Sequence, residues 1–586
     1  MPRRLRFVPL GVLALLFLAP VALAGHSTDP RSPNLVPLGH IVEPRLTGGP
    51  NGPNGGPQDP GGPDIHTDLG FWGTLAVQGT WLGFDLRDVS NPAAPQQISY
   101  TTCAGNQGDV LIYRNIVVRS WNSATPATPA TNPLARADRV CDGQPVAVGF
   151  EGLHVFDITN RANPQLVAQV PTPSGSHTAT AVPDPANNRL LVYNAASSGL
   201  APPAGSQIDI VSIPLTAPQN ATLIRSVPAG GSCHDIQVKL GTTNMAVCAG
   251  GNGFRVFSIG GERGGSLTFP ELLYGVVVPT VTIGHSSSFS WNGEIIVYGW
   301  EPGGGTQAEC EAADDPLKKS LYFYRSSDGA LLGTWVLPRP QGPNENCTLH
   351  NFNVVPFLDR HVLVHGSYQA GTGVVDFTNP AAPQEIAWSD PPPEAVPSAG
   401  TTAFFCTQST PPGCALGGAW ATYWYNGPLY ESNISEGLNV WQVNEPWWGN
   451  AVRLGHMNPQ TQDAAITCTG RVQGPRLVVR RHATLRINIR ALAVSPDDST
   501  SQPARGVTVR LRGAGINRTV RTNSSGSVSV AVHPMRQGTL RLSASALNME
   551  PCTTTLAVAR APRTGGGAAG GGAGGGAGLT GRFVSR

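Results

Sequence analysis

LGFDLRDVSNPAAPQQI, residues 82–98, is a sequence motif that recurs along the chain. It joins a β-rich segment to an Asp, an Asn-Pro pair and a second β-rich segment. The full copies lie at 82–98, 153–170, 208–224 and 372–388, and shorter copies begin at Phe254, Leu321 and Leu438. Seven copies at intervals of roughly 50–70 residues indicate one structural unit repeated along the chain.

Each unit also contains alternating segments that predict further strands. An example is HSSSFSWNGEIIVYGW at 285–300, where Asn292-Gly293 predicts a tight hairpin because both residue types tolerate positive φ. A unit of about four antiparallel strands is one blade of a β-propeller, and blades arranged around an axis hide most sheet edges. The sequence therefore predicts an all-β fold in which residues 33–445 form a seven-bladed β-propeller.

The two ends of this region predict how the ring closes. The last unit, residues 418–443, lacks its Asn-Pro pair and its fourth strand. Residues 33–43 contain an isolated segment with the character of a strand, PNLVPLGHIV. We expect this segment to complete the last blade, and we expect residues 48–63 to form a flexible Gly/Pro loop.

A second domain follows the repeats. Residues 466–560 contain alternating strands at short intervals, such as GVTVRLRG at 506–513, which predict a small Ig-like β-sandwich. Residues 561–586 are rich in Gly and Ala and are expected to be a disordered tail.

Composition excludes the main alternative fold classes. The 586 residues include 71 Gly and 53 Pro, a density that long helices and coiled coils do not tolerate. Hydrophobic residues make up 40% of the chain, which is enough for a sizeable core, so global disorder is excluded as well.

The N-terminus predicts export. Residues 1–24 combine three Arg, an apolar run and the small-residue site Ala22-Leu23-Ala24, as in a signal peptide. No later segment is apolar over the about 18 residues that a spanning helix needs. We therefore expect a secreted or cell-surface protein without an integral membrane span.

The ten Cys fit disulfides in an exported chain, and the absence of CxxC argues against thiolate zinc sites. Sequence alone leaves the connectivity open. Sequential pairing, the simplest scheme, joins Cys103–Cys141, Cys233–Cys248, Cys310–Cys347, Cys406–Cys414 and Cys468–Cys552.

The formal net charge of +2 is the sum over two regions of opposite charge and the basic N-terminal segment. Residues 466–586 hold seventeen Arg and three acidic residues, a net charge of +14, and residues 25–465 carry −15. We expect the basic C-terminal domain to contact an anionic surface polymer, and the alternative is a solvated Arg-rich surface. Nucleic acid is not expected as a partner of an exported protein.

The innermost strand of each blade lines the central channel, and aligning the blades on their hairpins identifies equivalent positions on these strands. Those positions hold His66, Gln107, His177, His234, His285, His350 and Trp420. Five His among seven positions, in a chain with 13 His, predict a ring of imidazoles at the channel mouth. Neutral imidazole suits transition metals such as Zn, Cu or Fe, so the five His are our predicted metal ligands, with no other cofactor.

Two carboxylates are candidates for catalysis beside these His. Glu301 ends the second strand of the fifth blade, and Glu345 precedes His350 by five residues in an incoming loop. Either could ligate a metal or act as a general base. The alternative is a structural role for the His, because WD-repeat propellers carry a Gly-His pair that only makes hydrogen bonds within its own blade. Gly284-His285 has the same form.

The endings Asp88-Val89-Ser90-Asn91-Pro92 and Asp376-Phe377-Thr378-Asn379-Pro380 resemble those of the LVIVD-repeat proteins, which are exported bacterial β-propellers. The stretches 233–236, 301–307, 345–351 and 423–427 are also similar to that family. The resemblance covers about residues 33–445 and implies the propeller fold, whereas the activity of the family is largely undefined. The C-terminal domain resembles a generic bacterial Ig-like module.

Three functions remain open from the sequence. The first is a secreted or surface-associated propeller that binds a ligand or partner, with a metal at its His-lined channel mouth and the second domain as spacer or anchor. The second is a metal-dependent propeller enzyme of the oxidase or hydrolase type. The third is a structural adhesion or matrix protein.

Overall fold

The regular structure consists of β-strands, with no α-helix in the part of the chain that the structure describes. This computed structural model describes residues 25–41, 65–105, 107–123, 139–196, 207–241, 243–305, 309–343, 345–393, 417–560 and 579–585. Short 3-10 turns lie at Gly25–Thr28, Pro185–Asn187, Pro218–Asn220, Gly261–Arg263, Pro302–Gly305, Pro316–Lys319 and Trp448–Asn450. None of the described helices is long and apolar enough to cross a membrane.

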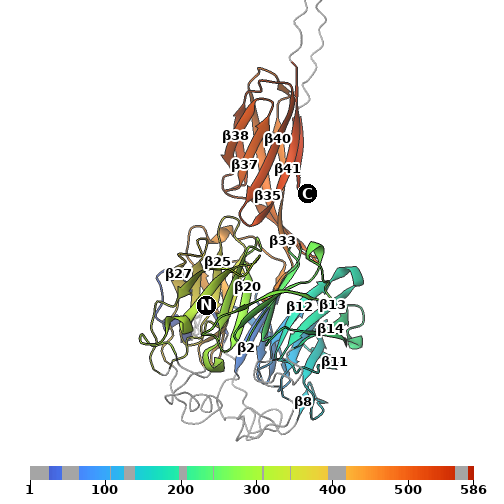
Figure 1. The fold of residues 1–586 in the computed structure, drawn as a ribbon, viewed down its shortest axis with the longest axis vertical. Helices are drawn as coiled ribbons and strands as arrows, with labels where there is room; N and C mark the ends of the chain where they lie inside the picture. The colour runs from blue at the N-terminus through green and yellow to red at the C-terminus, as the bar shows by residue number, and fades with distance from the viewer. Residues whose placement is uncertain are drawn as a thin grey trace, which may run out of the picture.

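Antiparallel sheets follow one another along the first part of the chain and curl around a common centre, as in a propeller (Figure 1). The first contains β2 (His66–Trp72), β3 (Leu75–Thr80), β4 (Gly83–Asp88) and β5 (Gln96–Thr102). The next contains β6 (Val110–Tyr113), β7 (Ile116–Trp121), β10 (Gly152–Asp157) and β11 (Gln165–Pro171), with the small hairpin β8 (Val140–Cys141) and β9 (Gln144–Pro145) before β10. It is followed by β12 (Thr178–Asp184), β13 (Arg189–Ala195), β14 (Gln207–Pro214) and β15 (Thr222–Pro228).

The remaining sheets repeat the same order from the inner to the outer strand. They contain β16 (Asp235–Lys239), β17 (Met245–Gly250), β18 (Gly253–Ser258) and β19 (Glu271–Val277), then β20 (Gly284–Phe289), β21 (Ile295–Trp300), β22 (Ser320–Arg325) and β23 (Leu331–Val336). A continuous sheet then joins β24 (Asn351–Val355), β25 (Val362–Gly366), β26 (Thr372–Asp376) and β27 (Gln384–Trp388) to β28 (Ala419–Trp424), β29 (Leu429–Asn433), β30 (Gly437–Val443) and β1 (Leu35–Ile41).

The ends of this region meet in one sheet. β1 pairs antiparallel with β30, from Leu35 opposite Val443 to Ile41 opposite Leu438. This is the pairing that the sequence predicted for the isolated segment near the N-terminus. It covers the outer edge of β30 with a strand that lies far away in the sequence, and so removes an exposed edge.

Burial follows strand position in each sheet. The inner strands are buried on both faces; β20, for example, has no exposed residue. The outer strands β15 and β19 are mostly exposed or half-buried. Side chains between neighbouring sheets form the core, such as Phe84 against Phe156 at 4.8 Å between ring centroids. The centre of the ring is therefore lined by short, closely packed inner strands.

A connecting segment lies against the centre of the ring on the side of the second domain. It contains β31 (His456–Met457), which pairs with β2, and β32 (Thr461–Gln462), which pairs with β16. Its side chains hydrogen-bond to several inner strands: Asn458 to Ile112, Thr461 to the Ala181 carbonyl and Gln462 to the Phe289 carbonyl. No pattern in the sequence predicts this contact.

The second domain stands above the propeller in Figure 1 and consists of strands whose residues alternate between buried and exposed. The strands are β33 (Ala465–Gly474), β34 (Leu477–Val478), β35 (Ala483–Val494), β36 (Ser499–Pro503), β37 (Thr508–Gly513), β38 (Ile516–Arg521), β39 (Ser527–Val532), β40 (Gly538–Ala546), β41 (Met549–Ala559) and β42 (Leu579–Ser585).

β42 corrects one expectation. The sequence predicted a disordered tail over 561–586, but Leu579–Ser585 forms a strand that pairs with both β33 and β41. The physical reason is alternation: Phe583 is fully buried in the core while its neighbours face outward. Residues 561–578 lie outside the described residues.

Four disulfides join the pairs that sequential connectivity predicted: Cys103–Cys141, Cys233–Cys248, Cys310–Cys347 and Cys468–Cys552. Such a set fits an extracellular protein. The expected Cys406–Cys414 pair, the signal peptide over 1–24 and the loop over 48–63 lie outside the described residues.

Candidate metal centre

Four histidines occupy equivalent places at the start of successive inner strands. Three of them, His177, His234 and His350, donate their backbone N–H to the carbonyl of the last or next-to-last residue of the adjacent second strand. His285 is the second residue of β20. Because each sheet repeats the same register, the four imidazoles enter the centre of the ring at the same level.

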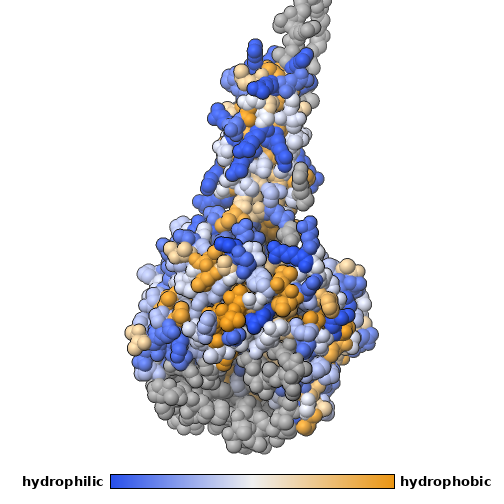
Figure 2. Space-filling view, viewed as in Figure 1, coloured by the Kyte–Doolittle hydropathy of each residue, from blue (hydrophilic) through white to orange (hydrophobic). Residues whose placement is uncertain are grey.

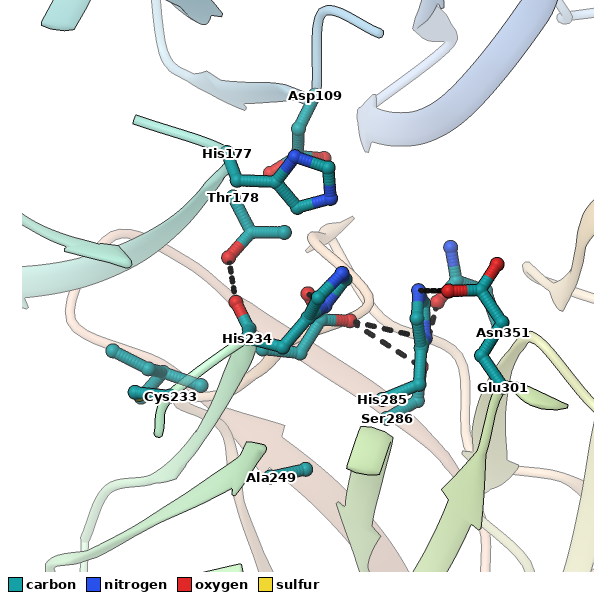
Figure 3. A network of polar contacts seen from close by, with 12 residues as sticks. Asp109, His177, Thr178, Cys233, His234, Ala249, His285, Ser286, Glu301 and Asn351 are labelled. Atoms are coloured by element: carbon teal, nitrogen blue, oxygen red, sulfur yellow. Dashed lines mark hydrogen bonds and ion pairs between the residues drawn. The ribbon is translucent and has the colours of Figure 1, made fainter. Parts of the chain in front are cut away.

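The four imidazoles form a continuous row. Ring centroids lie 4.4 Å apart for His177 and His234, 4.2 Å for His234 and His285, and 4.1 Å for His285 and His350. All four side chains are buried, and Figure 3 shows three of them directed into a shared space. A cavity of about 20 Å³ lies among them, and about 10–15 Å³ is enough to hold one water.

Hydrogen bonds to the Nδ1 atoms fix the tautomers of three of these rings. His350 Nδ1 donates to the Trp420 carbonyl at 2.7 Å, and His234 Nδ1 lies 3.3 Å from a carboxylate oxygen of Asp235. His285 Nδ1 donates to the Ser286 hydroxyl at 2.6 Å, because that hydroxyl itself donates to the His350 carbonyl. In each neutral ring the lone pair is then on Nε2, the arrangement that outer hydrogen bonds impose on metal-ligating His.

His177 has the opposite arrangement. The Asn122 amide donates to its Nδ1 at 2.6 Å, so the proton of the neutral ring is on Nε2. His177 therefore supports the row by packing against His234 and does not offer an Nε2 lone pair.

Glu301 faces the Nε2 atoms from the end of β21. Its Oε1 lies 3.7 Å from His350 Nε2 and its Oε2 lies 3.9 Å from His285 Nε2. The Tyr368 hydroxyl donates to Oε1 at 3.0 Å and so orients the carboxylate. Ligand atoms of His234, His285 and Glu301 all lie within 4.8 Å of one another. Ligand atoms in a tetrahedral site with bonds of about 2.1 Å stand roughly 3.4 Å apart, so one ion fits between them after small movements.

Burial controls the charge of these groups. It lowers the pKa of His285, and it lowers the pKa of His350 to about 3, so both rings are neutral at ordinary pH. Burial also lowers the pKa of His234, but the hydrogen bond and charge of Asp235 outweigh it and raise that pKa overall. Burial raises the pKa of Glu301. The site thus presents the neutral imidazoles of His285 and His350 to a carboxylate that lacks a cationic Lys or Arg partner among the described residues.

Three buried aspartates line the same cavity, and sequence reasoning missed them. They are Asp68, Asp109 and Asp235. Tyr423 and Gln460 hydrogen-bond to Asp68, whose pKa burial raises to about 6, and burial raises the pKa of Asp109 too. A signal was available, because each of the four His is followed by a short polar residue, and in His234-Asp235 that residue is an acid.

Two of the predicted site residues lie elsewhere. His66 lies opposite Thr80, the last residue of β3, just as Gly284 lies opposite Trp300 at the end of β21. Thr67 therefore takes the place that His285 has in its sheet, and Thr67 and Asp68 line the cavity instead of His66. His66 Nδ1 lies 3.4 Å from the Ile434 carbonyl. The Glu345 carboxylate accepts the backbone N–H of Gly342 within its own loop, and no described contact joins it to the imidazoles. Gln107 and Trp420 do line the cavity.

The sheets that surround this cavity place the site in a known architecture. The chain contains a β-propeller. No family model matches the sequence, and no curated protein does. The resemblance to LVIVD-repeat proteins therefore stays a prediction.

Solved structures match the chain at low similarity. One is a chain of the crystal structure of the mitotic checkpoint complex, with 8% identity and a TM-score of 0.37, covering 76% of this chain and 100% of that one. Another is the β-propeller domain of Cps50 (Swd1) from Myceliophteria thermophila, with 12% identity and a TM-score of 0.31, covering 52% of this chain and 80% of that one.

Proposed function

We propose that this protein is an exported, seven-bladed β-propeller metalloprotein that holds one first-row transition metal with His234, His285, His350 and Glu301. In this proposal the propeller binds a small ligand, which reaches the metal through the channel mouth. The second domain, an Ig-like sandwich in this proposal, acts as spacer or anchor. The observation that carries the proposal is the cluster of ring nitrogens from His234, His285 and His350 around the Glu301 carboxylate.

The structural alternative explains these contacts less well. A His with a purely structural role uses its ring nitrogens for hydrogen bonds, and buried polar atoms are nearly always paired. The Nε2 atoms of His285 and His350 stand 3.9 Å and 3.7 Å from Glu301. Both separations exceed hydrogen-bond distance and suit two ligands of one ion.

The ligand set indicates the class of metal. Imidazole with one carboxylate suits Zn, Cu or Fe, whereas Ca²⁺ and Mg²⁺ prefer oxygen ligands. A bound metal would supply Lewis-acid or redox chemistry beside the small cavity. The chain's own residues hold and orient it: Asp235, Ser286 and the Trp420 carbonyl fix the rings, and Tyr368 fixes the carboxylate.

Metal analysis of the untagged full-length protein tests this proposal. We expect about one transition-metal ion per chain, lost in His285→Ala and His350→Ala but kept in His482→Ala, a matched change at an exposed site in the second domain. Absence of stoichiometric metal after reconstitution with Zn²⁺, Cu²⁺ and Fe²⁺ would overturn the proposal. Retention of metal by both site variants would overturn it as well.

The enzyme alternative rests on the same centre. In this alternative His234, His285 and His350 hold the metal and leave one position for water or substrate, as catalytic metal sites do, and the cavity next to His285 has room for such a molecule. A metal-dependent oxidase or hydrolase activity that disappears with Glu301→Gln would favour the enzyme over the binding module. Metal binding without turnover of ester, phosphoester or thiol substrates would favour the binding module.

A further inference from the structure

One face of the second domain carries a regular array of arginine and hydroxyl side chains. It belongs to the sheet formed by β38, β37, β40 and β41, whose other face is buried through Val509, Leu511, Leu540 and Leu542. Cross-strand register places the outward residues in three rows: Arg521, Thr508 and Ser545; Thr519, Arg510, Ser543 and Thr553; and Asn517, Arg512, Arg541 and Thr555. We call these eleven residues the arginine face.

The positive charge on the arginine face is uncompensated. Arg512 and Arg541 stand directly opposite each other on β37 and β40, an arrangement that is unfavourable for like charges. Arg510 lies two residues from Arg512 on the same side of its strand, about 7 Å away. Among the described residues no carboxylate forms an ion pair with any arginine of this face.

The three acids of the domain are used elsewhere, at its junction with the propeller. Asp497 forms an ion pair with Arg114, and Asp498 accepts a hydrogen bond from His456 at 2.8 Å. Glu550 lines a cavity with Lys239 of the propeller. Figure 2 shows hydrophilic residues projecting from the domain above the propeller. Its free surface therefore remains cationic.

The side chains around the arginines indicate the class of partner. Stacking of nucleic acid bases needs exposed aromatic rings, but residues 466–586 contain one Phe and no Tyr or Trp, and that Phe583 is buried. Insertion into a membrane surface needs exposed apolar side chains, and the arginine face has none. Thr, Ser and Asn can instead exchange hydrogen bonds with sugar hydroxyls, and guanidinium groups pair with carboxylate or sulfate in two parallel hydrogen bonds.

We propose that the arginine face binds a linear anionic polysaccharide. Its acidic groups pair with Arg510, Arg512 and Arg541, and its hydroxyls contact the intervening Thr and Ser side chains. The rows repeat at the spacing of alternate strand residues, which suits a polymer with regularly spaced charges. The arginine face is separate from the metal centre, so this proposal does not depend on the proposed function.

Binding of full-length protein to immobilised polygalacturonate and dextran sulfate, with neutral dextran as blank, tests the proposal. The triple variant Arg510→Gln, Arg512→Gln, Arg541→Gln should weaken binding at least roughly tenfold, since each loses charge-assisted hydrogen bonds. The control variant Arg161→Gln, Arg476→Gln, Arg536→Gln removes the same charge at exposed positions outside the face and should weaken binding less than about threefold.

Other results would overturn the proposal. Equal losses in the two triple variants would mean that net charge alone attracts the polymer. Tighter binding to single-stranded oligothymidylate or to phosphatidylserine vesicles than to both polysaccharides would assign the face to another class of partner. Unchanged metal content and far-UV circular dichroism in both variants would show that the comparison concerns folded protein.

Discussion

Tyr368 donates its hydroxyl hydrogen to Glu301 Oε1 at 3.0 Å while its ring lies 4.7 Å from the ring of His350. Its backbone φ is +42°, which is unfavourable for a residue with a large side chain. The side chain is also fully buried. The fold thus keeps a strained tyrosine at the point where it can fix both the carboxylate and an imidazole.

Removal of that hydroxyl should loosen the metal without unfolding the protein. Tyr368→Phe leaves Glu301 free to rotate, and loss of such outer hydrogen bonds typically lowers metal affinity about 10–100-fold. Competition with a chromophoric chelator measures the change. Tyr193→Phe is the matched control, because its buried hydroxyl donates to the Leu267 carbonyl in another part of the ring. Equal metal affinity in the two variants would contradict a positioning role for Tyr368.

Glu301→Gln should separate metal affinity from stability of the metal-free fold. The glutamine has nearly the same shape, and burial already raises the pKa of Glu301 because the charged form is disfavoured there. We expect equal or higher thermal stability without metal and loss of the stabilisation that added metal gives to the wild type. Differential scanning calorimetry with and without chelator measures both. A large drop in the stability of the metal-free variant would contradict this expectation.

His456 should make the protein lose stability as the pH rises. Burial alone would lower its pKa, but Asp463 at 2.9 Å and Asp498 at 2.8 Å outweigh burial and raise it to about 10. The unfolded value is about 6.5, so the extra stability is complete below that pH and disappears as the pH rises toward 10.

The variant His456→Asn tests this dependence. It should cost about 2–3 kcal/mol at pH 6, since a buried ion pair loses one partner, and much less at pH 10. Urea denaturation at both pH values measures the difference in unfolding free energy, with His482→Asn as the exposed control. A cost that stays constant or grows with pH would refute the assigned charge of His456.

The disulfide between Cys468 and Cys552 should matter more than the one between Cys233 and Cys248. The first closes 84 residues and the second closes 15. Restriction of the unfolded chain then predicts stabilisation of about 4.5 and about 3 kcal/mol, respectively. Paired Cys→Ser variants compared by urea denaturation give the order, and the reverse order would contradict the chain-entropy account.

The connecting segment that contains β31 and β32 should be essential to propeller stability. Asn458 is buried, accepts the Ile112 N–H at 2.9 Å and donates to the Ile112 carbonyl at 2.8 Å. Asn458→Ala leaves both backbone groups without these partners, at a cost of about 2–3 kcal/mol. Asn517→Ala, at an exposed position of β38, is the control. A similar melting temperature for the two variants would show that the segment contributes little.

Much of the propeller architecture follows from local pattern. The alternation of apolar and polar residues and the Asp-Asn-Pro motif predict strands such as β4 and β26, because strand formation depends on neighbouring residues along the chain. The four described disulfides follow from order along the chain, since consecutive Cys lie in the same or adjacent units. The equivalent placement of His177, His234, His285 and His350 follows from the repeat, which gives each inner strand the same starting point.

Other parts of the centre depend on residues that meet only when sheets pack together. His66 stands one place before the position that His285 takes in its sheet, an offset that no local pattern marks, so Thr67 and Asp68 line the cavity instead. The contact of Tyr368 with Glu301 joins two different sheets. β42 returns to the second domain from beyond the Gly/Ala-rich stretch, because the buried Phe583 completes a core that other strands build.

The sequence by itself determined the all-β repeat and which residue type stands at the start of each inner strand. Only the tertiary structure decided which imidazoles present a free Nε2, which carboxylate faces them and how the connecting segment with β31 and β32 lies against the centre of the ring. The reason is physical: period and turn chemistry are properties of adjacent residues, whereas approach distances, and the tautomers of His177 and His350, are fixed by contacts between sheets. The ring that brings these sheets together closes through the pairing of β1 with β30.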